Sequence, residues 1–229
     1  MGTTKSAEEV KREHIDAMGF ELGSLFNLLY NEIIWLHYKW SDFEELYGTK
    51  ESRINLINQS APFFFFIVQK VLWENILLGI ARITDPVKSR GKRNITIQAL
   101  PDFLNDEKLK AKLKLLISEI IEKTKFSRDW RNRRISHYDF DLSINKEALP
   151  LEVVNRLLIK KSLELILEVI NLLLSHYFKS TLLAKTIKTQ TGSLALLHVL
   201  RDGQKERENY IKRIRTGQFY IDDNDSNEI

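Results

Sequence analysis

The chain has 229 residues, of which 43% are apolar and 29% are charged, and this balance excludes wholesale disorder. Basic residues outnumber acidic residues by only four, so net charge alone is weak support for nucleic-acid binding. The absence of cysteine excludes disulfides, thiolate nucleophiles and cysteine-ligated zinc, and it fits an intracellular, cytoplasmic protein.

The N-terminal residues are polar and helix-prone, without the apolar core of a signal peptide. The longest apolar run, residues 61–68, is far shorter than a bilayer span. We therefore expect a soluble protein that does not associate with a membrane.

Helical periodicity dominates the first half of the chain. Helices are predicted over residues 6–17 and 20–47, where apolar residues recur every three or four positions and Gly48 ends the second helix. A third helix is predicted over residues 60–84, with Pro62 in its first turn. Because this third helix is apolar nearly all round, we expect it to lie at the centre of its domain.

The second half is predicted to be helical as well, after a basic loop at residues 87–95. The expected helices cover residues 101–104, 108–122, a basic segment that begins near Ser127 as its N-cap, 151–178 and 193–215. Residues 1–217 therefore predict one all-α domain, a helical bundle. We expect the acidic tail, residues 218–229, to be disordered.

The most informative stretch places an arginine and a histidine in strongly basic surroundings, DWRNRRISHYD at residues 129–139. A guanidinium such as that of Arg131 can hold a phosphate by two parallel hydrogen bonds, and an imidazole such as that of His137 can transfer a proton near neutral pH. On a regular helix, Arg133 and His137 share a face, whereas Arg131 and His137 lie about 120° apart.

The tips of Arg131 and His137 would meet only if the arginine curls round the helix, the helix is distorted, or a second subunit completes the site. The alternative is a solvated basic face, with His137 packed in the core or capping a helix end.

Further charged residues surround this pair in the sequence. The basic residues expected to contact a nucleic-acid backbone are Lys125, Arg128, Arg133, Arg134, Lys88, Arg90, Lys92 and Arg93. Charges at the end of the apolar helix need partners or water, so Glu74, Arg82 and Asp85 are expected to bond to one another or to the Arg/His helix. Tyr138 and Asp139 are further candidates to support the site from beside His137.

No motif in the sequence predicts a metal or a cofactor. The other histidines show no HExxH-type pairing, and no Walker loop, G-x-G-x-x-G or nucleophile elbow is present. The run of phenylalanines at residues 63–66 is expected to pack in the core, because consecutive helical residues point in different directions and cannot form one stacking platform.

Three stretches together resemble the HEPN superfamily, and within it an abortive-infection branch. They are YGTKESR at residues 47–53 with SAPFF at 60–64, RITDP at 82–86, and WRNRRISHYD at 130–139. The resemblance spans roughly residues 20–200 and implies a HEPN-like core with additional helices. Residue by residue, it implies that Arg131 and His137 are the catalytic pair and that Asn132 orients them.

The resemblance also implies a homodimer in which two such motifs face one site, without a metal or any other cofactor. Some HEPN toxins carry a tyrosine two residues after the histidine, which a partner enzyme modifies. Asp139 occupies that position here, with Tyr138 beside it, so we do not expect this regulation.

The implied activity is a metal-independent endoribonuclease that acts as a toxin or abortive-infection effector, with an antitoxin or another defence protein as partner. Its mechanism is attack of the RNA 2′-hydroxyl on the adjacent phosphate, which excludes DNA as a substrate. Two alternatives remain: a non-catalytic HEPN-type module that binds RNA, a nucleotide or a partner protein, and a purely structural dimerisation domain.

Overall fold

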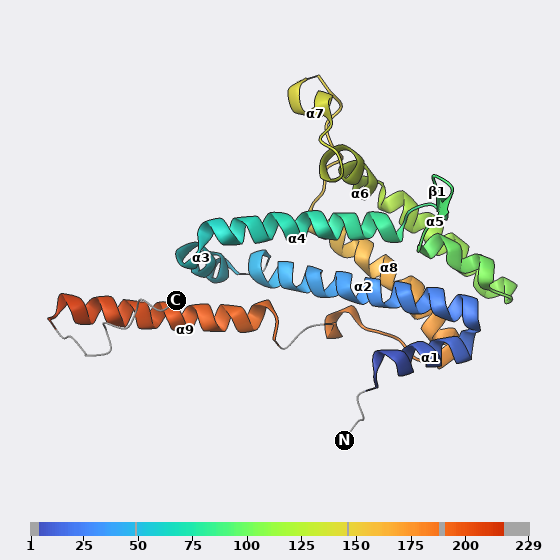
Figure 1. Cartoon of the computed structure of the whole chain (residues 1–229), viewed down its shortest axis with the longest axis horizontal. Coiled ribbons are helices and arrows are strands. Elements are labelled where there is room, and N and C mark those ends of the chain that lie inside the picture. The colour runs from blue at the N-terminus through green and yellow to red at the C-terminus, as the bar shows by residue number, and fades with distance from the viewer. Residues whose placement is uncertain (1–4, 49, 146, 188–190, 218–229) are drawn as a thin grey trace. The chain divides into compact units, whose positions relative to one another are not determined.

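The computed structural model describes residues 5–48, 50–145, 147–187 and 191–217. Helices form nearly all of the secondary structure in these ranges (Figure 1), so the predicted all-α class is confirmed. The predicted acidic tail lies outside the described residues. Contacts divide the chain into two compact units: residues 1–41 with 70–188 (unit 1), and residues 42–69 with 189–229 (unit 2).

Unit 1 begins with a helical hairpin. Helix α1 (Ala7–Met18) starts at a capping box, in which the hydroxyl of Ser6 accepts from the backbone of Glu9 and the Glu9 side chain accepts in return. Gly19 ends it at φ 84°, a conformation that glycine adopts without steric cost, and the chain turns into α2 (Phe20–Tyr47). The two helices approach closely, because a Cβ on Gly23 would lie 2.5 Å from the carbonyl oxygen of His14.

The core of unit 1 is built from apolar stripes on α2, the second half of α4 (Pro62–Ile83), α5 (Glu107–Lys123) and α8 (Arg156–Phe178). Gly79 of α4 lies against Leu36 of α2, since a Cβ at that position would come within 2.8 Å of the leucine side chain. The 3₁₀ helix η1 (Ile97–Phe103) adds further buried apolar residues. These packed stripes bury the apolar surface that stabilises the unit.

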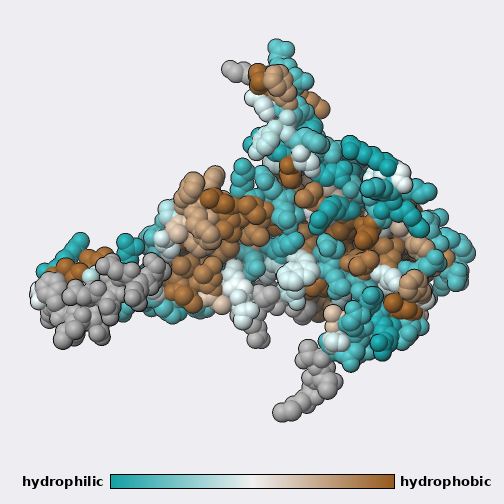
Figure 2. All heavy atoms as spheres, viewed as in Figure 1, coloured by the Kyte–Doolittle hydropathy of each residue, from teal (hydrophilic) through white to brown (hydrophobic). Residues whose placement is uncertain are grey.

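Helix α4 differs from the prediction that it lies at the centre of its domain. Ile76, Leu77 and Ile80 in its second half are fully buried. In its first turns, however, Phe63, Phe64 and Phe66 are between 58% and 75% exposed, and Figure 2 shows apolar residues at the surface where α4 begins. The prediction that the phenylalanine run packs in the core is therefore wrong for three of its four members, because only Phe65 is buried.

Helix α4 is also the one helix, among the residues that the structure describes, that is long and apolar enough to cross a membrane by length and composition. One such helix is weak evidence for a membrane span, and 28% of its most apolar window is buried in the structure.

The basic segment after α4 forms a small hairpin where a loop was predicted. Strands β1 (Lys88–Ser89) and β2 (Lys92–Arg93) pair antiparallel. Arg90 and Gly91 connect them at φ 47° and 78°, the positive values that a two-residue hairpin turn of type I′ requires at both positions. The loop prediction failed because two-residue strands carry no detectable alternation.

Unit 2 contains a helix that periodicity did not predict, α3 (Glu51–Ser60), and the last helix α9 (Ser193–Arg215). The Asp42 carboxylate accepts from the backbone of Ser193 at 3.0 Å, where α9 begins. The Gln204 amide of α9 donates to the carbonyl oxygen of Leu56 and to the hydroxyl of Ser60 on α3. These bonds hold the two helices side by side.

Candidate active site

The helix that leads to the Arg/His segment begins earlier than predicted. Helix α6 (Lys125–Trp130) follows Thr124 directly after α5, and Ser127 is buried inside it. The Ser127 hydroxyl donates to the carbonyl oxygen of Thr124 at 2.7 Å, so this serine does not act as the N-cap. The prediction of a start at Ser127 was wrong because the helical direction changes at Thr124 with no proline or glycine to mark the change.

The Arg/His segment is a π-helical turn, η2 (Arg131–Ile135), which ends before the histidine. The backbone N–H of Ser136 donates to the carbonyl oxygen of Arg131 at 2.8 Å, the i→i+5 bond of a π-helix. The expectation that Arg133 and His137 share a regular helix face is therefore wrong. Of the routes by which Arg131 and His137 could meet, a distorted helix is present. Such π-turns occur frequently at functional sites.

Arg131 is held on two sides by neighbouring side chains. Its Nη1 lies 2.6 Å from each carboxylate oxygen of Asp85, and its Nε donates to Oδ1 of Asn132 at 3.0 Å. Both members of the ion pair are partly buried, with 22% and 19% of the side chains exposed. Within the described residues, Nη2 has no protein hydrogen-bond partner and remains available as a donor.

Asp85 is itself fixed by a network that the sequence did not reveal. Its carbonyl oxygen accepts from the hydroxyl of Thr96 at 2.7 Å and from the amide of Gln98 at 3.0 Å. The preceding residue, Thr84, accepts from both Gln98 and Arg128 through its carbonyl oxygen. The turn that carries Asp85 is thus tied both to η1 and to α6, so its carboxylate is a rigid support for Arg131.

His137 lies in a bend after η2, and its side chain is exposed to solvent. Among the described residues, no hydrogen bond or ion pair joins it to Arg131, Asn132 or Asp85. His137 therefore does not pack in the core, and the alternative of a solvated basic face stays open for this segment. The structure brings Arg131, Asn132 and Asp85 together and leaves the imidazole free.

Two of the arginines expected to contact RNA are engaged within the protein. Arg133 bonds to the carboxylates of Asp139 and Asp129 and to the carbonyl oxygen of Leu149. Arg128 donates to Thr84 and Ile121, and burial lowers the pKa of its guanidinium. Both arginines hold chain segments in place, so an RNA contact by either would compete with these bonds.

Of the remaining basic candidates, Arg134 is half-buried and the others are exposed. Arg134 lies over the Tyr138 ring at 5.0 Å, and Lys125 bonds to Glu122 at 2.6 Å. Lys88, Arg90, Lys92 and Arg93 are exposed on the hairpin, with the Arg93 guanidinium 5.8 Å from the ring centre of Phe103. RNA binding by these residues stays a prediction.

The charged residues that were predicted to support the Arg/His segment do not all lie next to Arg131. Asp139 caps the short helix α7 (Phe140–Ile144), and the backbone N–H of Leu142, followed by the guanidinium of Arg133, lowers the pKa of its carboxyl. Arg82 pairs with Glu32 across an exposed 3.4 Å contact, away from Arg131. Glu74 has no bond to the site within the described residues. Asp85 alone among the candidates on α4 and its end contacts Arg131.

An exposed apolar segment follows His137, and the sequence reasoning did not single it out. Six large side chains there are more than half exposed: Tyr138, Phe140, Ile144, Leu149, Val153 and Leu157. The helix predicted to begin at Leu151 begins only at Arg156, after the N-cap Asn155, so part of this segment is extended. So many exposed apolar side chains in one segment are typical of a contact surface.

The described residues contain no group of three or more His, Asp or Glu side chains arranged to hold a metal. The candidate site therefore consists of the guanidinium of Arg131, the amide of Asn132 that bonds to it, and the exposed imidazole of His137. Such a set can bind phosphate and transfer a proton.

Comparison with known proteins identifies the family. A family model, HEPN_AbiU2, described as AbiU2, matches residues 21–195, which include all of the elements that build the site. Neither the curated proteins nor the solved structures contain a match to the chain. The chain therefore belongs to the HEPN_AbiU2 family, a HEPN-type abortive-infection family.

Proposed function

We propose that this protein is a metal-independent endoribonuclease of the HEPN type that acts in the cytoplasm as a toxin or abortive-infection effector. The observation that carries the proposal is the set of hydrogen bonds that fixes the guanidinium of Arg131. Its Nε and Nη1 are fixed by Asn132 and Asp85, while its Nη2 has no partner in the described part of the chain. A guanidinium fixed in this way is a preorganised donor for a phosphate oxygen.

The proposed reaction needs only groups of the protein and of the RNA. The 2′-hydroxyl attacks the adjacent phosphate, the bond to the 5′-oxygen of the next nucleotide breaks, and a 2′,3′-cyclic phosphate forms. His137 transfers a proton, either as the base that takes it from the 2′-hydroxyl or as the acid that gives it to the departing 5′-oxygen. Such proton transfer contributes about 10²–10⁴-fold in rate. Arg131 stabilises the additional negative charge of the phosphorane by hydrogen bonds that strengthen in the transition state.

A homodimer is part of the proposal, because no contact joins Arg131 to His137 within the described chain. The six apolar side chains between residues 138 and 157 are each more than half exposed, and an exposed apolar segment of this kind is typical of a protein contact surface. A second copy that covers this segment would lie next to His137. The two motifs could then complete each other, with RNA bound along the exposed basic residues of the hairpin.

One observation favours a second candidate function, a non-catalytic RNA-binding or partner-binding module. The carboxylate of Asp85 already neutralises much of the charge of Arg131, and His137 has no bond that orients it in the described residues. In this case the protein would bind RNA in a salt-sensitive manner through its exposed basic residues, or bind an antitoxin or other defence protein, without cutting the strand.

The test uses the purified full-length protein, labelled RNAs of varied sequence at neutral pH, and EDTA. The proposal expects strand cleavage that persists in EDTA and falls at least about 100-fold in Arg131→Ala and in His137→Ala. Salt-sensitive RNA binding without cleavage by the wild type would support the second candidate instead.

A further inference from the structure

A groove in unit 2 joins basic side chains from two helices that are far apart in the sequence. The groove lies between α3 and α9 and has a volume of about 500 Å³. Its lining extends from Lys50 to Gln59 along α3 and from Leu194 to Gln204 along α9. At 1.5 Å per helical residue, each side is about 14 Å long. The groove therefore has the volume of a ligand site and the length to hold part of a linear chain.

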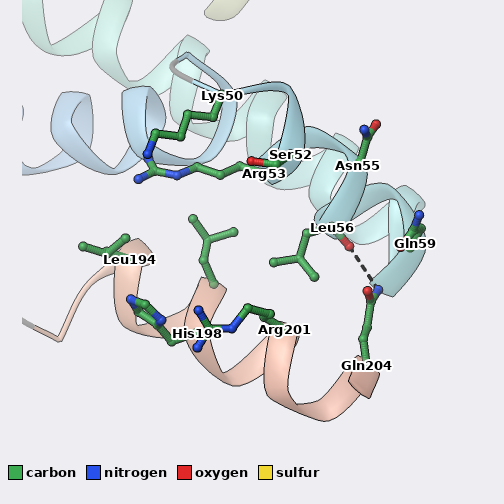
Figure 3. A pocket seen from close by; sticks show the side chains of 11 residues that line it. Lys50, Ser52, Arg53, Asn55, Leu56, Gln59, Leu194, His198, Arg201 and Gln204 are labelled. Atoms are coloured by element: carbon green, nitrogen blue, oxygen red, sulfur yellow. Dashed lines mark hydrogen bonds between the residues drawn. The ribbon is translucent and has the colours of Figure 1, made fainter. Parts of the chain in front are cut away.

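Four basic side chains gather at the end of this groove that lies near the start of α9. Figure 3 shows Lys50 and Arg53 on the α3 side, and His198 and Arg201 on the α9 side. Among the described residues, those that line the groove include no Asp or Glu. Because side chains of one sign of charge line a concave surface, the electrostatic field is concentrated there and attracts anions.

Three of these basic groups keep hydrogen-bond donors that no protein group uses in the part of the chain that the structure describes. The ammonium of Lys50 and the imidazole of His198 take part in no hydrogen bond or ion pair there. Arg201 bonds to the carboxylate of Asp202 through Nε at 3.0 Å, so its Nη1 and Nη2 remain available. These donors match the oxygens of a phosphate, which accept hydrogen bonds from cationic groups.

Leucine side chains also line the groove, beside the basic groups. They are Leu56 of α3 and Leu194 and Leu197 of α9, and Leu194 is 43% exposed. At the end opposite the basic groups, the Gln204 amide donates to the carbonyl oxygen of Leu56 (Figure 3). The bases of single-stranded RNA are free to contact apolar side chains and to stack on guanidinium planes, whereas those of a duplex are paired and stacked inside it.

We propose that the α3–α9 groove binds single-stranded RNA, with phosphates at Lys50, His198 and Arg201 and a base against the leucines. The identity of the polyanion rests on the proposed function, in which RNA is the substrate. Arg131 and His137 belong to unit 1, so the groove contributes affinity for the strand and takes no part in the cleavage step.

The experiment measures how the full chain binds a fluorescent single strand of 2′-O-methyl RNA, which has no free 2′-hydroxyl and resists the proposed cleavage. Fluorescence anisotropy gives the affinity between about 50 and 200 mM salt. The double variant Lys50→Gln, Arg201→Gln should bind about 3- to 30-fold more weakly, because it loses two exposed charge contacts. The slope of log affinity against log salt should become shallower by about 1.4, since each phosphate contact of a single strand contributes about 0.7.

The matched control is Lys11→Gln, Arg12→Gln, which removes one lysine and one arginine that are exposed on α1. Its affinity and its salt slope should equal those of the wild type. Because both double variants change exposed side chains, their melting temperatures should match that of the wild type. A groove variant that binds the strand as tightly as the wild type, with the same salt slope, would overturn the proposal.

A second measurement locates the strand on the protein. The same strand with a photoreactive 4-thiouracil base is irradiated, and mass spectrometry identifies the crosslinked peptides. The proposal expects crosslinks within residues 50–59 and 194–204 that the groove variant loses, and crosslinks confined to other elements would overturn it.

Competition separates RNA from other anions. Polyglutamate or a mononucleotide, at an equal concentration of negative charge, should suppress the groove crosslinks much less than unlabelled RNA does. Equal suppression by either competitor would overturn the proposal, because the groove would then hold an acidic protein segment or a small anion. Cleavage plays no part in these measurements, so the RNA groove and the ribonuclease chemistry can each fail without the other.

Discussion

At the scale of single residues, the ion pair between Arg131 and Asp85 is the feature on which the site depends. It joins residues 46 positions apart, is partly buried, and fixes one edge of the guanidinium through a carboxylate that is itself held by Thr96 and Gln98 through the adjacent backbone. A charge-assisted hydrogen bond of this kind is worth about 1.5–3 kcal/mol. We interpret Asp85 as the residue that positions Arg131.

Asp85→Asn should therefore lower the rate of RNA cleavage about 10- to 100-fold with little change in RNA affinity, because the guanidinium keeps its charge but loses its fixed orientation. Single-turnover cleavage rates and RNA binding measure the two effects. Glu32→Gln, which opens the exposed pair with Arg82, is the matched control and should leave the rate unchanged. A variant Asp85→Asn as active as the wild type would show that the pair has no part in positioning.

The buried histidine His37 gives a second prediction at this scale, on how the free energy of unfolding depends on pH. Burial lowers the pKa of its imidazole to about 4, so the folded protein keeps it neutral where the unfolded chain, with a pKa near 6.5, is protonated. The contribution of His37 to the free energy of unfolding is therefore fully present above pH 6.5. It is lost as the pH falls toward 4, by about 3 kcal/mol in total.

The free energy of unfolding from urea titrations at pH 7 and pH 5 tests this. Wild type should lose about 2 kcal/mol more over this interval than His37→Gln does. His176→Gln, at an exposed histidine, should behave like the wild type. An equal loss in wild type and His37→Gln would contradict the assignment.

At the scale of elements, close helix packing at glycines gives a sharp test of the fold. A Cβ on Gly23 would lie 2.5 Å from the His14 carbonyl oxygen and 2.6 Å from Cα of Ile15, and these backbone atoms cannot move without separating α1 from α2. Gly23→Ala should thus destabilise the protein by about 1–3 kcal/mol.

Gly203 of α9 is the matched control, because a Cβ there meets nothing within 4 Å. Gly203→Ala should be neutral or stabilising by up to about 1 kcal/mol, since alanine favours a helix. The melting temperatures of both variants test this prediction. A Gly23→Ala variant that melts at the same temperature as the wild type would mean that α1 does not pack on α2 as described.

The sequence predicts some elements well, for identifiable reasons. The bounds expected for α2 and α9 agree with the structure, because long apolar periodicity and Gly48 define them. Helix α3 was missed because ESRINLINQS is mostly polar. The hairpin at Lys88–Arg93 was missed because its strands have two residues each.

The candidate site was predictable only in part. Arg131 and His137 could be named from the residues, and Asn132 from the family resemblance, but the π-turn at Arg131–Ile135 has no sequence signature. The contact between Arg131 and Asp85 could be proposed because a charge at the end of an apolar helix needs a partner. The hydrogen bonds from Thr96 and Gln98 that hold the backbone of Asp85 depend on tertiary packing and could not be predicted.

At the scale of the whole molecule, the proposed site requires two chains if Arg131 of one copy acts with His137 of the other. A mixture of Arg131→Ala and His137→Ala then yields heterodimers in which one of the two composite sites is intact. Co-expressed, differently tagged variants should recover RNA cleavage to roughly half of the wild-type rate per dimer.

Each variant alone provides the control, with no recovery. A heterodimer as inactive as the two parent variants would show that both residues of a site belong to one chain. Size measurements by light scattering on the same samples establish that heterodimers have formed. Phe140→Asp in the exposed apolar segment should weaken the dimer, whereas Leu115→Asp, at an exposed leucine of α5, should not.

The most direct test of the central proposal is the chemistry of the cleaved RNA. Purified wild-type protein in EDTA should produce fragments that end in a 2′,3′-cyclic phosphate, detected by mass spectrometry, and His137→Ala should produce at least about 100-fold less of them. An RNA with a single 2′-deoxy nucleotide at a cleavage position should remain intact there. Cleavage at that deoxy position, or an equal yield of fragments from His137→Ala, would contradict a ribonuclease that works through the 2′-hydroxyl and His137.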